Sequence, residues 1–126
     1  MSRSTEEQAA EAIRIIASAL ESGEAFLTYG TLEERLGRPG QGRLIGPVLN
    51  AAARRCLDGQ APDISAVVCT AKSTRTGMPM PSEGSFGSGG IQPISGFSQD
   101  DIRAEQERVR QFDWKSWISR MDRRHP

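Results

Sequence analysis

A few residues within the stretch 28–50, TYGTLEERLGRPGQGRLIGPVLN, have the types and spacing to contact a phosphate. Gly37, Gly42 and Arg43 fall close to where a phosphate-binding loop has glycine, glycine and lysine. Such a loop also needs a buried strand before it, a lysine for the β and γ phosphates and a hydroxyl for Mg²⁺. Here the preceding pattern is helical, arginine replaces the lysine and Leu44 replaces the hydroxyl. We therefore expect no nucleotide site, and the same residues fit the turn of a helix-turn-helix.

Other residue types that commonly carry catalysis are few and scattered. Cys56 and Cys69 show no metal-ligand spacing, and the one histidine, His125, stands beside the last residue. No nucleophile–base couple, paired carboxylates or metal cluster follows from this pattern. We expect buried structural cysteines, no cofactor, no metal and a protein that is not an enzyme. An enzyme that uses the long loop at 82–98 is an alternative that no such motif supports.

Charge is segregated along the chain, although its 16 basic and 16 acidic residues give a formal net charge of zero. Residues 1–34 hold seven glutamates against two arginines, whereas residues 35–80 hold seven basic side chains against two aspartates. Such segregation can place a basic face on a neutral protein. The alternative interpretation is that these are ordinary solvated surface charges.

The first helix is predicted from its ends and its apolar spacing. Ser4 and Glu7 match a capping box, and Gly23 is typical of a helix C-terminus. The outer face is acidic, so we expect it to point away from a phosphate backbone. The apolar face is expected to contain Ala9, Ala12, Ile13, Ile16, Ala17 and Leu20.

Two further helices are predicted around a turn that is rich in glycine and proline. The second helix starts after Thr28 or, alternatively, at a capping box on Thr31, and Gly37 ends it. The third covers 43–58, because Pro47 is tolerated only in a first helical turn.

The segment 63–71, DISAVVCTA, alternates in polarity and is rich in β-branched residues, which predicts a strand. Residues 72–79 are expected to form a turn after it. A return strand is predicted within 76–87 from a weaker pattern. Residues 82–98 are a Gly/Ser-rich loop, and loops of this length are typical of functional or poorly ordered segments.

The C-terminal segment predicts a helix that starts at Ser98 with Asp101. A shift in the apolar spacing indicates a kink or a second helix that Asp113 caps. Four apolar residues on this last part either fill the core or anchor a partner chain: Trp114, Trp117, Ile118 and Met121.

This order of elements is typical of a winged helix. We therefore expect one domain over 1–126, α+β but mostly helical, with a winged helix-turn-helix core at about 4–80, a loop at 82–98 and an added helical segment at 99–122. No apolar run approaches the ~18 residues of a membrane span, and the N-terminus lacks the apolar core of a signal peptide. A cytoplasmic protein without a membrane partner is expected.

Within 29–49 the residues follow a pattern of Tyr-x-x-Leu, a glycine that ends the helix, and Arg-x-[Val/Ile]-Gly-x-x-[Met/Leu]. This pattern resembles the DNA-binding subdomain of alkylguanine-DNA alkyltransferases and alkyltransferase-like proteins. The resemblance covers about a sixth of the chain densely, and about half if the following Val-Val segment is included. The matching residues are Tyr29, Leu32, Gly37, Arg43, Ile45, Gly46, Val48 and Leu49.

The resemblance implies how this stretch would contact DNA. Tyr29 would meet the phosphate backbone near a flipped nucleotide, and Arg43 would enter the duplex where that nucleotide left. The helix would lie in the minor groove. Its groove-facing side would present Gln41, Gly42, Gly46 and Asn50. Basic residues of the helix and the wing complete the predicted surface: Arg38, Arg54, Lys72 and Arg75.

The chain departs from that family at its reactive centre. The family motif is Pro-Cys-His-Arg-Val-Val, with tryptophan for cysteine in the alkyltransferase-like branch. Here PDISA precedes Val67 and Val68, and neither Cys56 nor Cys69 occupies the nucleophile position. No histidine is available to activate a thiolate. Alkyl transfer is therefore not expected.

The leading hypothesis is a small non-enzymatic winged-helix protein that binds duplex DNA through helix 43–58 and the wing, mainly by phosphate contacts. The alternative is a protein-interaction module, in which the C-terminal helix binds another protein or a second copy of the chain. The neutral net charge and the amphipathic C-terminal helix favour that alternative.

Overall fold

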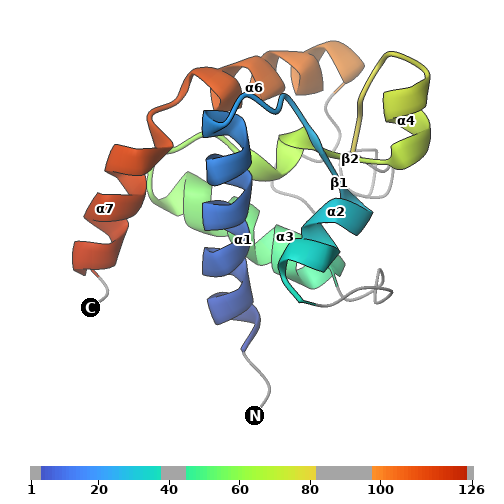
Figure 1. Cartoon of the computed structure of the whole chain (residues 1–126). Helices are drawn as coiled ribbons and strands as arrows, with labels where there is room; N and C mark the ends of the chain where they lie inside the picture. Colours follow the sequence, from blue (N-terminus) through green and yellow to red (C-terminus); the bar gives the residue numbers. More distant parts are fainter. Residues whose placement is uncertain (1–3, 38–44, 82–97, 125–126) are drawn as a thin grey trace.

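Helices dominate the computed structural model of the chain, which describes residues 4–37, 45–81 and 98–124 (Figure 1). The mostly helical α+β class predicted from the sequence is confirmed. The elements in chain order are α1 (Thr5–Glu21), β1 (Leu27–Thr28), α2 (Tyr29–Arg35), α3 (Ile45–Asp58), the 3₁₀ helix η2 (Ile64–Val67), β2 (Val68–Cys69), α4 (Ala71–Arg75), α6 (Gln99–Gln111) and α7 (Trp114–Arg124). None of the helices in these ranges is long and apolar enough to cross a membrane.

Helix α1 forms as its sequence predicts. Ser4 is the N-cap, and its hydroxyl and the Glu7 carboxylate make the reciprocal bonds of a capping box. Gly23 follows the helix with a φ of 100°, a conformation in which glycine has no steric penalty. The apolar face packs against α3. Its buried residues are Ala9, Ala12, Ile13, Ile16, Ala17 and Ala19.

Helix α2 starts at the first of the two predicted positions. The Thr28 hydroxyl accepts a hydrogen bond from the Thr31 backbone N–H at 3.2 Å, which makes Thr28 the N-cap. Gly37, with a φ of 78°, follows the C-terminus as predicted. Residues 38–44, which include the predicted turn and the predicted start of the third helix, lie outside the described residues. Within the described residues α3 begins at Ile45.

The predicted strand at 63–71 is wrong over most of its length. Asp63 caps η2 instead, because its Oδ1 accepts hydrogen bonds from both the backbone N–H and the hydroxyl of Ser65, at 2.9 and 2.6 Å. Only Val68 and Cys69 are strand. Every residue from 61 to 69 is buried, so the alternation in the sequence does not separate a core face from a solvent face.

The predicted turn and return strand after this segment also differ from the structure. Thr70 caps a short helix, α4, in place of the turn. The chain then comes back to β2, since the Thr70 N–H donates to the Met80 carbonyl at 2.9 Å. Residues 76–81 form no strand. The Ser73 hydroxyl accepts a hydrogen bond from the Met80 N–H at 2.9 Å and donates to the Met80 carbonyl at 3.1 Å. The remainder of the predicted return strand, 82–87, lies outside the described residues.

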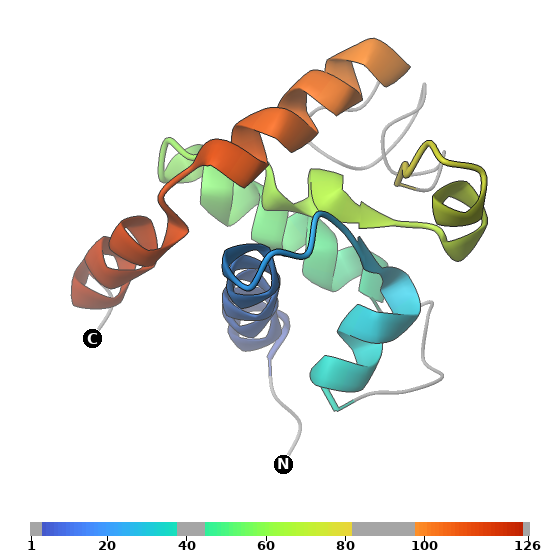
Figure 2. The same cartoon turned by 45° about the horizontal axis from the view of Figure 1, so that its top comes forward.

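The two strands make one short parallel pair, with Leu27 opposite Val68 and Thr28 opposite Cys69. The C-terminal segment consists of two helices, as the shift in apolar spacing predicted. Helix α6 starts with a Ser98–Asp101 capping box and packs on η2, and α7 turns away from it after an extended Phe112 (Figure 2).

Candidate nucleic-acid interface

The parallel strand pair brings two distant segments of the predicted DNA surface together. Thr28 and Cys69 are partners in the register, so the residues that follow them, Tyr29 and Thr70, emerge at the same end of the sheet. Tyr29 opens α2, and Thr70 caps α4. The N-termini of α2 and α4 therefore lie beside each other at this end of the sheet (Figure 1).

Helix α4 carries two basic side chains that have no counter-ion among the described residues. Lys72 and Arg75 are exposed, and neither side chain makes an ion pair or hydrogen bond with another described residue. Other basic side chains are neutralised locally: Arg35 by Glu24, Arg55 by Glu6, and Arg110 by Glu107. Within the described residues, the positive charge of α4 is thus not neutralised.

Tyr29 is less exposed than the two cations. Its side chain is partly buried and packs against the hydrophobic core. It also begins α2 directly after the sheet, where its backbone position is fixed by the Thr28 cap and by the strand register. We call Tyr29, Lys72 and Arg75 together the basic edge.

The predicted groove-facing residues of α3 lie off its buried face. Gly46 and Asn50 are partly buried, and Arg54 is exposed without an ion pair to any described residue. The Asn50 Oδ1 atom is shielded from solvent and accepts no hydrogen bond within the described ranges. The face that packs on α1 and η2 consists of Ile45, Val48, Leu49, Ala52, Ala53 and Cys56.

Four predicted DNA contacts cannot be placed beside these residues. Arg38, Gln41, Gly42 and Arg43 lie outside the described residues. The structure thus brings the start of α2 beside the start of α4 and sets Gly46, Asn50 and Arg54 along α3, whereas the predicted role of Arg43 stays a prediction.

The predicted partner contacts on the C-terminal helix divide into two kinds. Trp114 and Trp117 are only 5 and 3% exposed and belong to the core, so their predicted role as an exposed anchor is corrected and the core alternative is confirmed. Trp114 Nε1 donates to the Val109 carbonyl at 2.8 Å. Ile118 and Met121 are partly buried and line a hollow between α1, α3 and α7.

The two cysteines are buried and unpaired with each other. Burial raises the pKa of the Cys56 thiol and of the Cys69 thiol to about 12 each. Such thiols are almost entirely protonated at neutral pH and are poor nucleophiles. This chemistry matches the structural roles expected for both residues.

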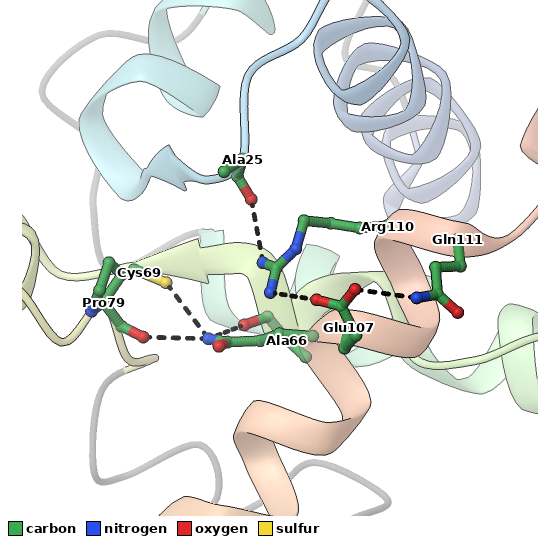
Figure 3. A network of polar contacts seen from close by, with 8 residues as sticks. Ala25, Ala66, Cys69, Pro79, Glu107, Arg110 and Gln111 are labelled. Carbon is green, nitrogen blue, oxygen red and sulfur yellow. Dashed lines mark hydrogen bonds and ion pairs between the residues drawn. The ribbon is translucent and has the colours of Figure 1, made fainter.

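A polar network that the sequence did not predict holds the segment after α4 in place (Figure 3). The Gln106 side-chain amide donates to the Ala66 and Pro79 carbonyls, each at 3.0 Å, and also contacts the Cys69 sulfur. Because Pro79 follows α4, this amide links α6 to the chain that carries the α4 cations. Nothing in the sequence distinguishes Gln106, since α6 also contains Gln99 and Gln111.

A second part of the same network anchors the chain that leads into β1. Arg110 donates to the Ala25 carbonyl at 3.5 Å, and its guanidinium lies 4.9 Å from the centre of the Phe26 ring. Glu107 accepts from Arg110 at 3.0 Å and from Gln111 at 2.9 Å (Figure 3). Helix α6 therefore contacts the chain before β1, the 3₁₀ helix η2 and the segment after α4.

Comparisons with protein-family models, with curated proteins and with solved structures found no match to this chain. The resemblance to the alkyltransferase DNA-binding subdomain therefore depends on its motif residues.

Proposed function

We propose that this chain is a non-enzymatic winged-helix protein that binds duplex DNA through the basic edge and α3. The observation that carries the proposal is the parallel register of β1 and β2, which places the start of α2, where Tyr29 lies, beside the start of α4. The two cations of α4 have no ion pair with any described residue. The resemblance independently assigns Tyr29 to the phosphate backbone. Lys72 and Arg75 then extend the same contact along the duplex as phosphate ligands, which position a protein without reading sequence.

The charges of the remaining surface agree with this orientation. Helix α1 carries exposed glutamates at positions 6 and 7. Helix α4 contains no acidic residue. A duplex approaching the basic edge therefore meets positive charge on α4 and avoids the acidic start of α1. Arg43 would complete this surface as the residue that enters the duplex.

The proposal can be tested by fluorescence anisotropy with a labelled random duplex at about 50 and 200 mM salt. Binding should weaken steeply with salt. The double variant Lys72→Ala/Arg75→Ala should bind more weakly and should reduce the slope of log K against log salt by about 0.9 for each phosphate that is no longer neutralised. Tyr29→Phe should weaken binding with little effect on that slope, because it removes a hydroxyl and no charge.

A matched control comes from α7, which lies at the opposite side of the molecule from α4 (Figures 1 and 2). Lys115→Ala/Arg120→Ala removes the same charge from two exposed positions. This variant should retain most of the affinity. Equal losses in the two double variants, or no binding at the lower salt concentration, would show that the basic edge is not a DNA surface.

The alternative proposal is a protein-interaction or dimerisation module on the C-terminal helix. Of its four predicted contacts, only Ile118 and Met121 reach the surface, since the two tryptophans are core residues. Light scattering of the unmodified chain and of Ile118→Asp tests this alternative. A dimer is supported if the unmodified chain has a mass above that of one chain and the variant has a lower mass.

A further inference from the structure

A hollow of about 290 Å³ lies on the face of the molecule where α1, α7 and the C-terminal end of α3 meet. Its volume is close to the lower end of the range typical of small-molecule sites. It does not include the basic edge. The apolar part of its lining consists of Ala10, Ile13, Trp117, Ile118 and Met121.

Trp117 is held rigidly in this lining. Its Nε1 donates to the Gly59 carbonyl at 2.9 Å. A Cβ atom at residue 59 would lie 2.7 Å from Trp117 Cζ2, so the indole can pack here only against a glycine. The fixed indole contributes a rigid apolar part of the lining, although the residue is only 3% exposed.

The charged residues around the hollow do not cancel. Arg14 pairs with Asp122, and Arg55 pairs with Glu6. Asp58 also lines the hollow, is exposed and makes no ion pair with any described residue. The described lining residues therefore carry one net negative charge.

The position of Asp58 adds to this negative potential. It is the last residue of α3, where the helix dipole places partial negative charge. The two arginines are already occupied by carboxylates, so an incoming anion would have to displace them. A cation, in contrast, meets the Asp58 carboxylate and the C-terminal end of α3 together.

We propose that this hollow binds a small organic cation in which an ammonium group is attached to an apolar body. The ammonium would pair with Asp58 near Trp117, and the apolar body would cover Ile13, Ile118 and Met121. This ligand site is separate from the DNA-binding proposal and does not depend on it.

The test uses the ¹⁵N-labelled full chain at neutral pH and two probes with the same apolar body and opposite charge, 4-phenylbutylamine and 4-phenylbutyrate. The indole N–H resonance of Trp117 should shift saturably with the amine and much less with the carboxylate. Trp114 does not line the hollow, so its indole resonance should shift less than that of Trp117. No shift at Trp117 with the amine, or tighter binding of the carboxylate, would overturn the proposal.

Two variants identify the charge that is responsible. Asp58→Asn should weaken amine binding about two- to five-fold, the worth of one partly exposed ion pair. Glu34→Gln on α2 removes an exposed acid outside the hollow and should leave the affinity unchanged. An unchanged affinity in Asp58→Asn would contradict the proposal.

Glu6→Gln gives a second, independent measurement. It releases Arg55 from its ion pair and removes the net negative charge of the lining. The preference for the amine over the carboxylate should therefore shrink or reverse. If the preference stays as in the unmodified chain, charge does not select the ligand and the proposal is wrong.

Discussion

Asp63 is the buried acid on which the local structure between α3 and β2 depends. Its side chain is fully buried, and its Oδ1 starts η2 by accepting both bonds from Ser65. Its Oδ2 has no hydrogen-bond partner within the described ranges, and its backbone N–H donates to Glu105 at 2.8 Å. Burial, followed by the nearby Glu105 carboxylate, raises the pKa of Asp63 from 3.8 to about 6, although the bonds from Ser65 oppose the shift.

This raised pKa predicts that the folded state loses stability as pH rises. The protonated acid is favoured in the folded chain, so its contribution is fully present below about pH 4 and is lost as pH rises to about 6. A shift of about two units corresponds to roughly 3 kcal/mol in the free energy of unfolding. Asp63→Asn, which cannot ionise, should remove this pH dependence in urea unfolding followed from pH 4 to pH 7.

Asp63→Asn also changes the free energy of unfolding by an amount that does not depend on pH. This offset does not affect the test, because only the change of the unfolding free energy with pH is compared. Asp100→Asn is the matched control, since Asp100 is exposed at the start of α6. Unfolding free energies that run parallel for Asp63→Asn and the unmodified chain would show that Asp63 does not titrate in this range.

Helices α1 and α3 end with the same pattern of backbone hydrogen bonds. The residue that must adopt a positive φ in this pattern differs between the two helices. After α1 the N–H groups of Gly23 and Glu24 donate to Leu20 and Ala19. After α3 the N–H groups of residues 60 and 61 donate to the carbonyl groups of residues 57 and 56. This is a Schellman motif, and it needs a positive φ at the first residue beyond the cap. Glycine meets that need after α1, whereas Gln60, with a φ of 63°, meets it after α3.

Gln60→Gly should therefore stabilise the chain, and Gly23→Ala should destabilise it. A left-handed conformation costs a non-glycine residue about 1–2 kcal/mol, partly offset by the greater unfolded-state entropy of glycine. We expect a gain of about 0.5–1 kcal/mol for Gln60→Gly and a loss of about 1 kcal/mol for Gly23→Ala in urea unfolding. Gly30→Ala in α2 is the control at an ordinary φ, with open space around the added methyl group. A loss of stability in Gln60→Gly would contradict this assignment.

Elements whose ends depend on near neighbours were predictable from the sequence. The Ser4 and Ser98 capping boxes and the Thr28 cap each involve residues three apart, and all three form. The segment 63–71 was not predictable in this way. Its backbone conformation depends on Asp63 locally and on burial of both faces, and burial is a property of the folded chain.

At the scale of the whole molecule, the candidate interface was predictable only in part. The sequence indicates Tyr29 through its motif and Lys72 and Arg75 through their charge. It does not show that these segments meet, because two-residue strands carry no periodic signal. The hollow at Trp117 was also missed, since it needs three helices to assemble before Asp58 is left without a counter-ion among the described residues.

Helix α7 contributes side chains to the core. This contribution determines whether the chain can fold without α7. Trp114 and Trp117 are both buried, and their rings contact each other edge to face at 5.6 Å. The Trp117 indole binds the turn after α3, and Asp122 pairs with Arg14 on α1. Removing residues 113–126 would therefore uncover the turn after α3 and part of the side of α1.

We expect the chain without residues 113–126 to lose its cooperative fold. Truncating a buried tryptophan costs about 3–5 kcal/mol, and two of them approach the roughly 5–15 kcal/mol that stabilises a typical domain. Thermal unfolding by circular dichroism and the dispersion of amide resonances measure the effect. Lys115→Ala/Arg120→Ala, which changes only the exposed side of α7, should unfold as the full chain does. If the truncated chain keeps an unchanged cooperative transition, α7 is a peripheral arm and a partner-binding role for it is favoured. If the fold is lost, any partner of α7 can contact only surface residues such as Ile118 and Met121.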